Sequence, residues 1–477
     1  MRFINIVIFS LVLCSFLLAQ NNVNNLVHKP KKIDQKYEHL IYDYRIPDWG
    51  YNRLSLYFYS NLYGNNDDND KNPSEREYTN TRYNGRIQPY FNLYRTSEKY
   101  IFSLYSSIDS YYDYYDERNE YDDQINKSLD QSLDHGINIS GNLNQYYGRL
   151  FYLSYNLINS FDYREDHNHY RYINKNSGST SNLKSWYIQR MYETQFRFGT
   201  GIGRVRNVTP VFRALRFSER LGDIGKAAGL NESDIKSLIY LFAQQSSYSN
   251  KYDRSAKYFY NAFPERVTKQ INNLQPWEMM YLNEAFNEII GDRYEGFELD
   301  GGIQFSHQHA INTNLYSDGE LTLLGAYLDQ QYYHNISTGY QIGVNTYASF
   351  SKPLNDNTPV HYLGRGSAEF LNLWNATDRI LMELNLGYET GFASIDVFGY
   401  LKQWQRWDRY RLSLSMDYFL ENYLSIGTSI TNIAYHYWPS TVDFEYDSRF
   451  FSGSGYDLEK NWSVSIDLRY YIMRGMY

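Results

Sequence analysis

Charged side chains alternate with apolar ones in the C-terminal part of the chain. From Trp462 to Ile472, apolar residues take every second position and polar residues take the positions between them. Successive side chains of a β-strand point to opposite faces, so this segment predicts a ribbon with one apolar and one polar face. Polar-face residues can contact water-soluble molecules, and here they carry both signs of charge, so no ion preference follows. The candidates are Glu383, Arg411, Asp417, Asp467 and Arg469.

A second group of candidates has helical spacing. Arg213, Arg216 and Arg220 recur at three- and four-residue intervals, so a helix would bring them to one face. We expect this stripe either to be solvated or to contact an anionic solute or a partner protein.

Two groups have the residue types of metal ligands without the pattern of a metal site. His307 and His309 would share one strand face, but no Asp or Glu lies beside them, and we interpret them as polar lining residues. Segment 66–72 resembles a calcium loop only in composition, because Pro73 and Thr79 stand where glycine and a bidentate Glu are required. The sequence therefore predicts no metal and no cofactor.

The residues also lack the motifs of common enzymes. Gly199, Gly201 and Gly203 alternate at a strand end, without the spacing or βαβ setting of dinucleotide binding, and are interpreted as permitting a bend. No G-x-S-x-G signature is present. We expect no enzymatic activity, and a lipid-facing Ser and His distant in sequence remain the alternative.

The N-terminus has the layout of a secretory signal peptide. A basic start is followed by the apolar segment 3–18 and a small residue, Ala19, so residues 1–19 are expected to be removed. A lipoprotein signal ending at Cys14 is the alternative, with Leu13 where a small residue is required. Cys14 is the single cysteine of the chain, which excludes disulfides from the mature protein.

Charge and composition narrow the class of protein further. Without Arg2 the chain has 45 basic and 54 acidic side chains, a net charge of −9, which argues against binding nucleic acid. Fifty-three tyrosines accompany a mean hydropathy of −0.63, so a dry soluble core would be small. Many alternating segments run for ten residues or more, the length of tilted membrane strands.

The connections between these segments are unequal. Long polar loops are predicted at 64–78, 115–134 and 164–182, and short turns near Thr96 to Lys99 and near Tyr147. If the first strand starts on one side of a membrane, six strands return the chain to that side near Gly203.

The period then changes from two to 3.6, which predicts an insertion of three to five helices. Thr209 is expected to cap the first helix, with Pro210 at its first helical position, and Asn231 with Asp234 to cap the next. The spacing of Ile235, Leu238, Ile239 and Phe242 predicts one apolar face of that second helix. The last is predicted to run from Pro276 to Gly291.

These features together resemble bacterial outer-membrane β-barrel proteins of the porin-like sort, with no specific family indicated. The resemblance implies an all-β transmembrane antiparallel barrel of 14 to 16 strands with a small α-helical insertion. The number of strands stays open because region 437–460 is either one long external loop or an extra strand and a turn. The implied division is a signal peptide (1–19), an N-terminal periplasmic segment (20–50), barrel (51–203), a helical insertion that is periplasmic or a plug (204–293), and barrel (294–477).

A barrel of this size has room for a lumen, so the resemblance implies a channel for small solutes. The alternative is a non-conducting scaffold whose helical insertion docks a periplasmic or envelope partner. The implied partners are outer-membrane lipid, lipopolysaccharide, the barrel-assembly machinery and, through the insertion, a periplasmic protein.

Overall fold

The computed structural model describes residues 37–470 with gaps. The gaps are 38, 68–74, 122, 149–150, 226–229, 253–254, 273, 288–289, 313–316, 356–359, 378–379, 398–400, 422–423 and 438–457. The predicted signal peptide, most of segment 66–72 and most of region 437–460 thus lie outside the described residues.

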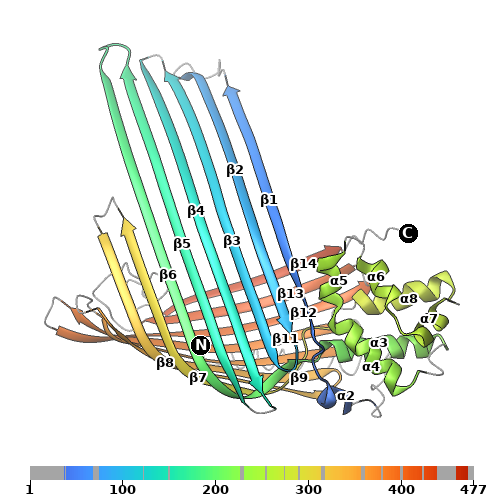
Figure 1. The fold of residues 1–477 in the computed structure, drawn as a ribbon. Helices are drawn as coiled ribbons and strands as arrows, with labels where there is room; N and C mark the ends of the chain where they lie inside the picture. Colours follow the sequence, from blue (N-terminus) through green and yellow to red (C-terminus); the bar gives the residue numbers. More distant parts are fainter. Residues whose placement is uncertain are drawn as a thin grey trace, which may run out of the picture.

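Among the residues that the structure describes, fourteen strands form one antiparallel sheet in which each strand pairs with the next in sequence. The first six are long and rise beyond the rest (Figure 1). The strands are β1 Trp49–Asp67, β2 Glu75–Thr96, β3 Tyr100–Tyr121, β4 Gln124–Tyr147, β5 Phe151–Asn174, β6 Thr180–Asn207, β7 Tyr294–Asn312, β8 Ser317–Ser337, β9 Tyr340–Pro353, β10 Val360–Thr377, β11 Ile380–Val397, β12 Leu401–Glu421, β13 Leu424–Tyr437 and β14 Leu458–Tyr470.

This architecture confirms the predicted fold class: an antiparallel all-β sheet within the predicted range of strand number, interrupted by a small helical insertion. Within the described residues β14 does not pair with β1, so the sheet is open along that side. Closure into a barrel stays a prediction.

Two of the predicted long loops are wrong. Segments 115–134 and 164–182 belong largely to β3, β4, β5 and β6, which continue to tight connections. A strand with polar side chains on both faces carries no apolar alternation, so its sequence looks like a loop. The short turn near Thr96 is confirmed, with Ser97 N donating to Tyr100 O at 2.8 Å.

The pairing registers assign every strand residue to one of two faces. On the apolar face of β1 and β14, Leu54 and Ile466 are 77% and 76% exposed, so these apolar side chains are not covered by other described parts of the protein. The opposite, polar face carries Asn138 on β4 and Asn385 on β11. The alternating apolar and polar residues of the sequence therefore lie on opposite faces of the sheet.

The helices gather beside the sheet near the start of β1 (Figure 1). Six follow β6 and one short helix precedes β1, so within the described residues the predicted three to five is too few. They are α2 His39–Asp43, α3 Thr209–Asp223, α4 Glu232–Ala243, α5 Gln245–Lys251, α6 Ser255–Asn261, α7 Glu265–Ile271 and α8 Pro276–Asn287.

These helices share one hydrophobic core, here called the helical subdomain core. The predicted apolar face of α4 is confirmed, since Ile235, Leu238, Ile239 and Phe242 are all buried there. Leu40 of α2 is buried in the same core, which ties the N-terminal segment to the insertion.

The helix ends match the sequence in part. The cap of α4 is confirmed: Asn231 Oδ1 accepts from Asp234 N at 2.9 Å, and Asp234 Oδ2 accepts from Asn231 N at 3.0 Å. Thr209 does not cap α3, because its hydroxyl accepts from the backbone N of Arg293 instead, at 2.8 Å. The described part of α8 ends at Asn287, and Gly291 (φ 70°) lies in the segment that returns to the sheet.

Candidate functional site

Two adjoining cavities form a groove on the polar face, from β4 to β10. One has a volume of about 180 Å³ and the other about 350 Å³. Arg197, Asp329 and Gln331 line both, so the two are continuous at these side chains. We call this site the Arg197 groove.

One wall of the groove is acidic and hydrogen bonded. Glu298, Asp300 and Asp329 all line the smaller cavity. Ser154 Oγ donates to Asp300 Oδ2 at 2.8 Å, and Tyr327 OH donates to the same oxygen at 2.9 Å. Donors from β5 and β8 thus hold the Asp300 carboxylate of β7 in one position.

The other wall carries a cation on aromatic rings. Arg197 Cζ lies 5.6 Å from the centroid of Tyr327 and 5.1 Å from that of Tyr347. Tyr347 is fixed in turn, since its hydroxyl donates to Gln304 Oε1 at 3.0 Å. A guanidinium held against ring faces keeps its N–H groups available in its own plane, where they can bind an anionic or polar group of a solute.

Glycines make room for this cluster. A Cβ on Gly199 would lie 2.3 Å from Tyr327 Oη, and one on Gly201 would lie 2.2 Å from Tyr152 Cζ. Any larger residue in these two places would displace the tyrosines. The interpretation of the glycine row as a bend fits only Gly203, whose φ is 85°.

A charged network continues the groove toward β12. Arg365 lines the larger cavity, and its Nε donates to Glu389 Oε1 at 2.9 Å. Arg409 Nη1 donates to the other oxygen of Glu389 at 3.4 Å. The polar face thus presents alternating charges across three neighbouring strands.

A wider cavity lies above the groove, between the long strands. Its volume is about 760 Å³, and Tyr57, Arg86, Asp134 and Asp162 are among the residues that line it. Arg86 Nε donates to Asp109 Oδ1 at 2.8 Å, so part of its charge is already paired.

The polar-face positions predicted from the sequence all lie on this face by register, but outside the Arg197 groove. Arg411 pairs with Gly387 and Asp417 with Leu381. Glu383 pairs with Ser415. Asp467 pairs with Gly427 and Arg469 with Ser425, on the last two strands.

The predicted arginine stripe of α3 is divided among three neighbours. Arg213 Nη1 donates to Gln245 Oε1 at 2.6 Å, and Arg216 Nη1 to Glu219 Oε2 at 3.0 Å. Arg220, which is buried, donates to the carbonyl oxygen of Tyr281 at 3.1 Å. These contacts lie inside the helical subdomain, and a partner at these residues stays a prediction.

His307 and His309 do share a face, but it is the apolar one, with Ile303 and Phe305. The interpretation of the two histidines as lumen-lining is therefore wrong. His307 Nδ1 lies 2.9 Å from Thr322 Oγ1. Nowhere in the described ranges do three or more His, Cys, Asp or Glu side chains gather as metal ligands would. Among the described helices, none has the length and apolar character to cross a membrane.

Arg204 is buried near the end of β6, on the side of the sheet where the connections between strands are short. Arg204 Nη1 donates to Glu98 O and Nη2 to Ser97 O, both at 2.7 Å, and its Cζ lies 4.0 Å from the Tyr146 ring centroid. Glu98 also accepts from Ile46 N at 2.7 Å, which attaches the N-terminal segment. Burial raises the pKa of the Glu98 carboxyl, but hydrogen bonds from Arg206 and Ile46 outweigh it and lower that pKa.

A second buried arginine, Arg293, directly precedes β7. Arg293 is 1% exposed, and its Nη2 donates to Gly339 O at 3.3 Å and to Asn375 Oδ1. Its Cζ lies 5.4 Å from the ring centroid of Phe212 in α3. Burial lowers the Arg293 pKa to about 10, with repulsion from Arg216 adding to it, so the group is still charged at neutral pH.

The helical subdomain contacts distant parts of the polar face. Arg53, on the polar face of β1, donates from Nη1 to Asn250 Oδ1 of α5 at 3.4 Å, and Ser247 of α5 donates to the backbone oxygen of Gly50 at 3.1 Å. A Cβ on Gly291 would lie 2.8 Å from Leu373 Cδ2, on the polar face of β10. The contacts to β1 and β10 attach the insertion to the turn end of the sheet at two places, one in α5 and one in the segment after α8.

Comparison with known proteins finds only loose structural similarity. The ferric citrate transporter FecA in its unliganded form is 8% identical, with a TM-score of 0.36; the alignment covers 81% of this chain and 52% of FecA. The translocator domain of the autotransporter NalP from Neisseria meningitidis is 8% identical, with a TM-score of 0.21 and coverages of 80% and 82%. OccK5 from Pseudomonas aeruginosa is 8% identical, with a TM-score of 0.21 and coverages of 88% and 98%.

The chain thus spans about half the length of FecA. No family model matches the sequence, and no curated protein does. A resemblance this loose says nothing about the activity of this chain.

The sequence gives no direct signal for the Arg197 groove. Arg197, Asp300 and Asp329 each occupy a polar-face position of their strand, and the alternation within each strand was enough to predict that face. Their meeting depends on the stagger between neighbouring strands, which alternation within a strand does not specify.

Proposed function

We propose that this chain is an outer-membrane β-barrel protein that passes small hydrophilic solutes along its polar face. The observation that supports this most is the division of the sheet into two faces. The apolar face leaves Leu54, Val464 and Ile466 each about 70% exposed or more, which suits lipid and not water. The opposite face carries the Arg197 groove and the wider cavity above it.

The helical subdomain is proposed to cover the periplasmic mouth. The chain order supports this placement, because six strands lead from β1 to the first long helix at the short-turn side. Contacts at Gly50 and Leu373 attach the insertion to the turn ends of β1 and β10, the end of the sheet at which this mouth is proposed to lie. A solute entering from that side would meet the helices before it reached Arg197.

Single-channel recording in planar bilayers tests the proposal. We expect stepwise currents from the folded chain, and larger steps after residues 205–292 are replaced by a short linker. Arg197→Ala should shift selectivity toward cations, because Asp300 and Asp329 would remain, whereas Arg197→Lys should shift it little. A folded, inserted chain without current, with or without the subdomain, would contradict the channel.

The second candidate is a non-conducting scaffold. It is favoured by the helical subdomain, which has a hydrophobic core of its own and exposes Trp277 to 62%. In that case the deletion would leave the membrane silent and remove a bound envelope partner. The same recordings therefore separate the two functions.

A further inference from the structure

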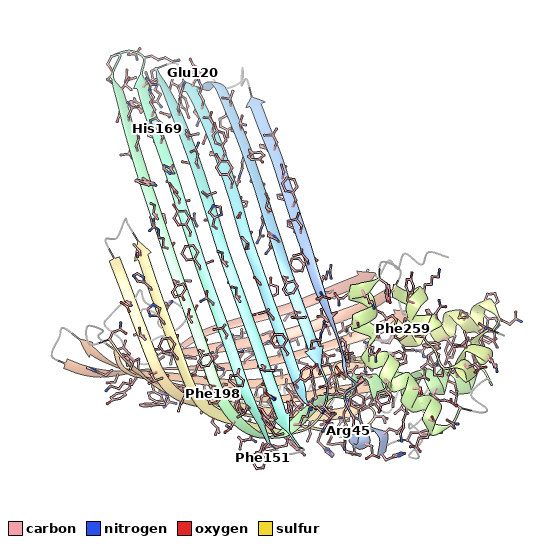
Figure 2. The ribbon with its side chains drawn as sticks, viewed as in Figure 1. Arg45, Glu120, Phe151, His169, Phe198 and Phe259 are labelled. Atoms are coloured by element: carbon pink, nitrogen blue, oxygen red, sulfur yellow. The ribbon has the colours of Figure 1, made fainter. Side chains whose placement is uncertain are left out.

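The apolar face changes character in the upper part of the long strands. Going up β5, its residues on this face are apolar or aromatic to Phe161 and Tyr163, with Asn159 as an exception, and then become Glu165, His167 and His169. Figure 2 shows Phe151 at the lower end of these strands and His169 near the upper end. The eleven residues from Leu153 to Tyr163 match the length of one membrane strand, so the face above Tyr163 lies outside the hydrocarbon.

Basic side chains concentrate on this upper face. Lys127, His169, Arg171 and Lys184 lie there on β4, β5 and β6. On the same face of these strands above Tyr163, Glu165 is the one acidic residue. The chain as a whole has a net charge of −8, so this is a local reversal of sign. We call Lys127, His169, Arg171 and Lys184 the upper basic patch.

The registers place the basic side chains against one another. Lys127 lies directly opposite Arg171, and His169 directly opposite Lys184. Like charges directly across a ladder destabilise a sheet. Asp116 and Glu120 of β3 lie on the same face beside Lys127, but among the described residues Lys127, Arg171 and Lys184 form no ion pair that would offset this repulsion. An anion between the strands would.

The patch also contains a hollow with an exposed aromatic ring. A cavity of about 330 Å³ is lined by His167, His169, Lys184 and Trp186. Trp186 is 60% exposed, stacks on His167 at 5.6 Å between centroids, and is held by its Nε1 donating to Glu165 Oε1 at 3.1 Å. The Nε2 of His169 is covered and has no hydrogen-bond partner in the described structure.

We propose that the upper basic patch binds the phosphorylated saccharide headgroup of a glycolipid in the outer leaflet. Lysine and arginine are the groups that bind phosphate, and an exposed indole offers a flat apolar surface to a sugar ring. Lys184 pairs with His169, six residues above Tyr163 and about 20 Å along the strand, where a headgroup projects from the acyl chains. The assignment rests on the membrane placement proposed above.

Lipid binding by a charge-loss variant tests this site. The variant is Lys127→Gln/Arg171→Gln/Lys184→Gln, and the matched control removes three charges from the polar face of the long strands, Arg82→Gln/Arg86→Gln/Arg164→Gln. Both are folded into phosphatidylcholine vesicles, and lipid A binding to the extracted proteins is measured by native mass spectrometry. We expect the first variant to bind lipid A at least about tenfold more weakly than the unmodified chain, and the control to bind it equally.

Two further probes identify the ligand. The unmodified chain should bind dephosphorylated lipid A no better than the triple variant binds intact lipid A. Trp186→Ala should weaken the binding of intact lipid A without changing folding. Equal binding by the unmodified chain and the triple variant overturns the site. Free glucosamine phosphate that competes as well as lipid A overturns a lipid in favour of a soluble phosphosugar. A chain that does not insert into any vesicle refutes the membrane placement first, which separates that failure from the failure of the patch.

Discussion

The long strands β2–β6 and the short strands β9, β13 and β14 use the same alternation for different purposes. The long strands have 22 to 28 residues, more than twice what a membrane crossing needs, whereas β9, β13 and β14 have 13 or 14. The lower part of each long strand repeats the apolar and polar faces of the short strands. Above that part both faces are mostly polar although the strands continue, so the alternation ends where exposure to lipid ends and not where the strand ends.

The largest expected effect comes from a charge placed at mid-height on the apolar face. Ile139→Arg in β4 and Leu414→Arg in β12 should each lower the free energy of unfolding by about 2–4 kcal/mol, since both side chains would face hydrocarbon. Leu133→Arg lies on the same face as Ile139 but beside Glu165, above Tyr163, and should cost about 0–1 kcal/mol. Urea titration of vesicle-inserted protein measures all three. Equal costs for Ile139 and Leu133 would remove the boundary between the two parts of the long strands.

The next effect concerns the arginines that end the long half and begin the short half. Arg204→Ala and Arg293→Ala each leave buried carbonyl acceptors without a donor, and should cost about 2–3 kcal/mol. Arg293→Ala should also make the helical subdomain more sensitive to protease, because its contact with Phe212 is lost. Protease digestion of folded protein gives the readout, with Arg213→Ala as the control inside the subdomain. Unchanged cleavage in Arg293→Ala would show that the subdomain is held by other contacts.

A smaller effect is expected from glycine-to-alanine substitutions, which should destabilise the protein at the groove but not high on the long strands. Gly201→Ala places a methyl group against the Tyr152 ring and should lower the free energy of unfolding by roughly 1–2 kcal/mol. Gly64→Ala, high on β1, meets only Asn80 O at 3.8 Å and should be nearly neutral. Thermal unfolding followed by circular dichroism compares them. A neutral Gly201→Ala would mean that the tyrosine cluster repacks without strain.

The smallest effect is a pH dependence at the junction with the N-terminal segment. The pKa of Glu98 is lowered from its ordinary 4.5, so its carboxylate stabilises the fold above that pH, and the contribution is lost as pH falls through the lower folded value. Glu98→Gln should remove this dependence and cost up to about 1 kcal/mol at neutral pH. Equilibrium unfolding at several pH values below neutral provides the test. An identical pH profile for the variant and the unmodified chain would assign the dependence to other carboxyls.

Much of the fold was predictable from local pattern, and the site was not. The alternation around Trp462 and Leu414 identified the faces of strands correctly, because lipid-facing residues must be apolar. The extensions of β4 and β5 were missed, because segments such as Asp130 to Asp134 and Arg164 to Asn168 have no apolar phase.

The groove was missed for a different reason. Ser154, Asp300 and Tyr327 come from three strands and meet across two glycines, and only the stagger of the strands brings them together. The buried cations Arg204 and Arg293 likewise depend on hydrogen bonds to residues 46 to 107 positions away along the chain.

Labelling of alternate single cysteines tests the division of the sheet into a lipid face and a water face. In a Cys14→Ser background, cysteines are introduced at the neighbouring positions Asn138 and Ile139 of β4, and Leu384 and Asn385 of β11. The folded protein in vesicles is treated with a charged, membrane-impermeant maleimide. We predict rapid labelling at 138 and 385 and protection at 139 and 384. Equal labelling at all four positions, or protection in the opposite phase, would contradict the account.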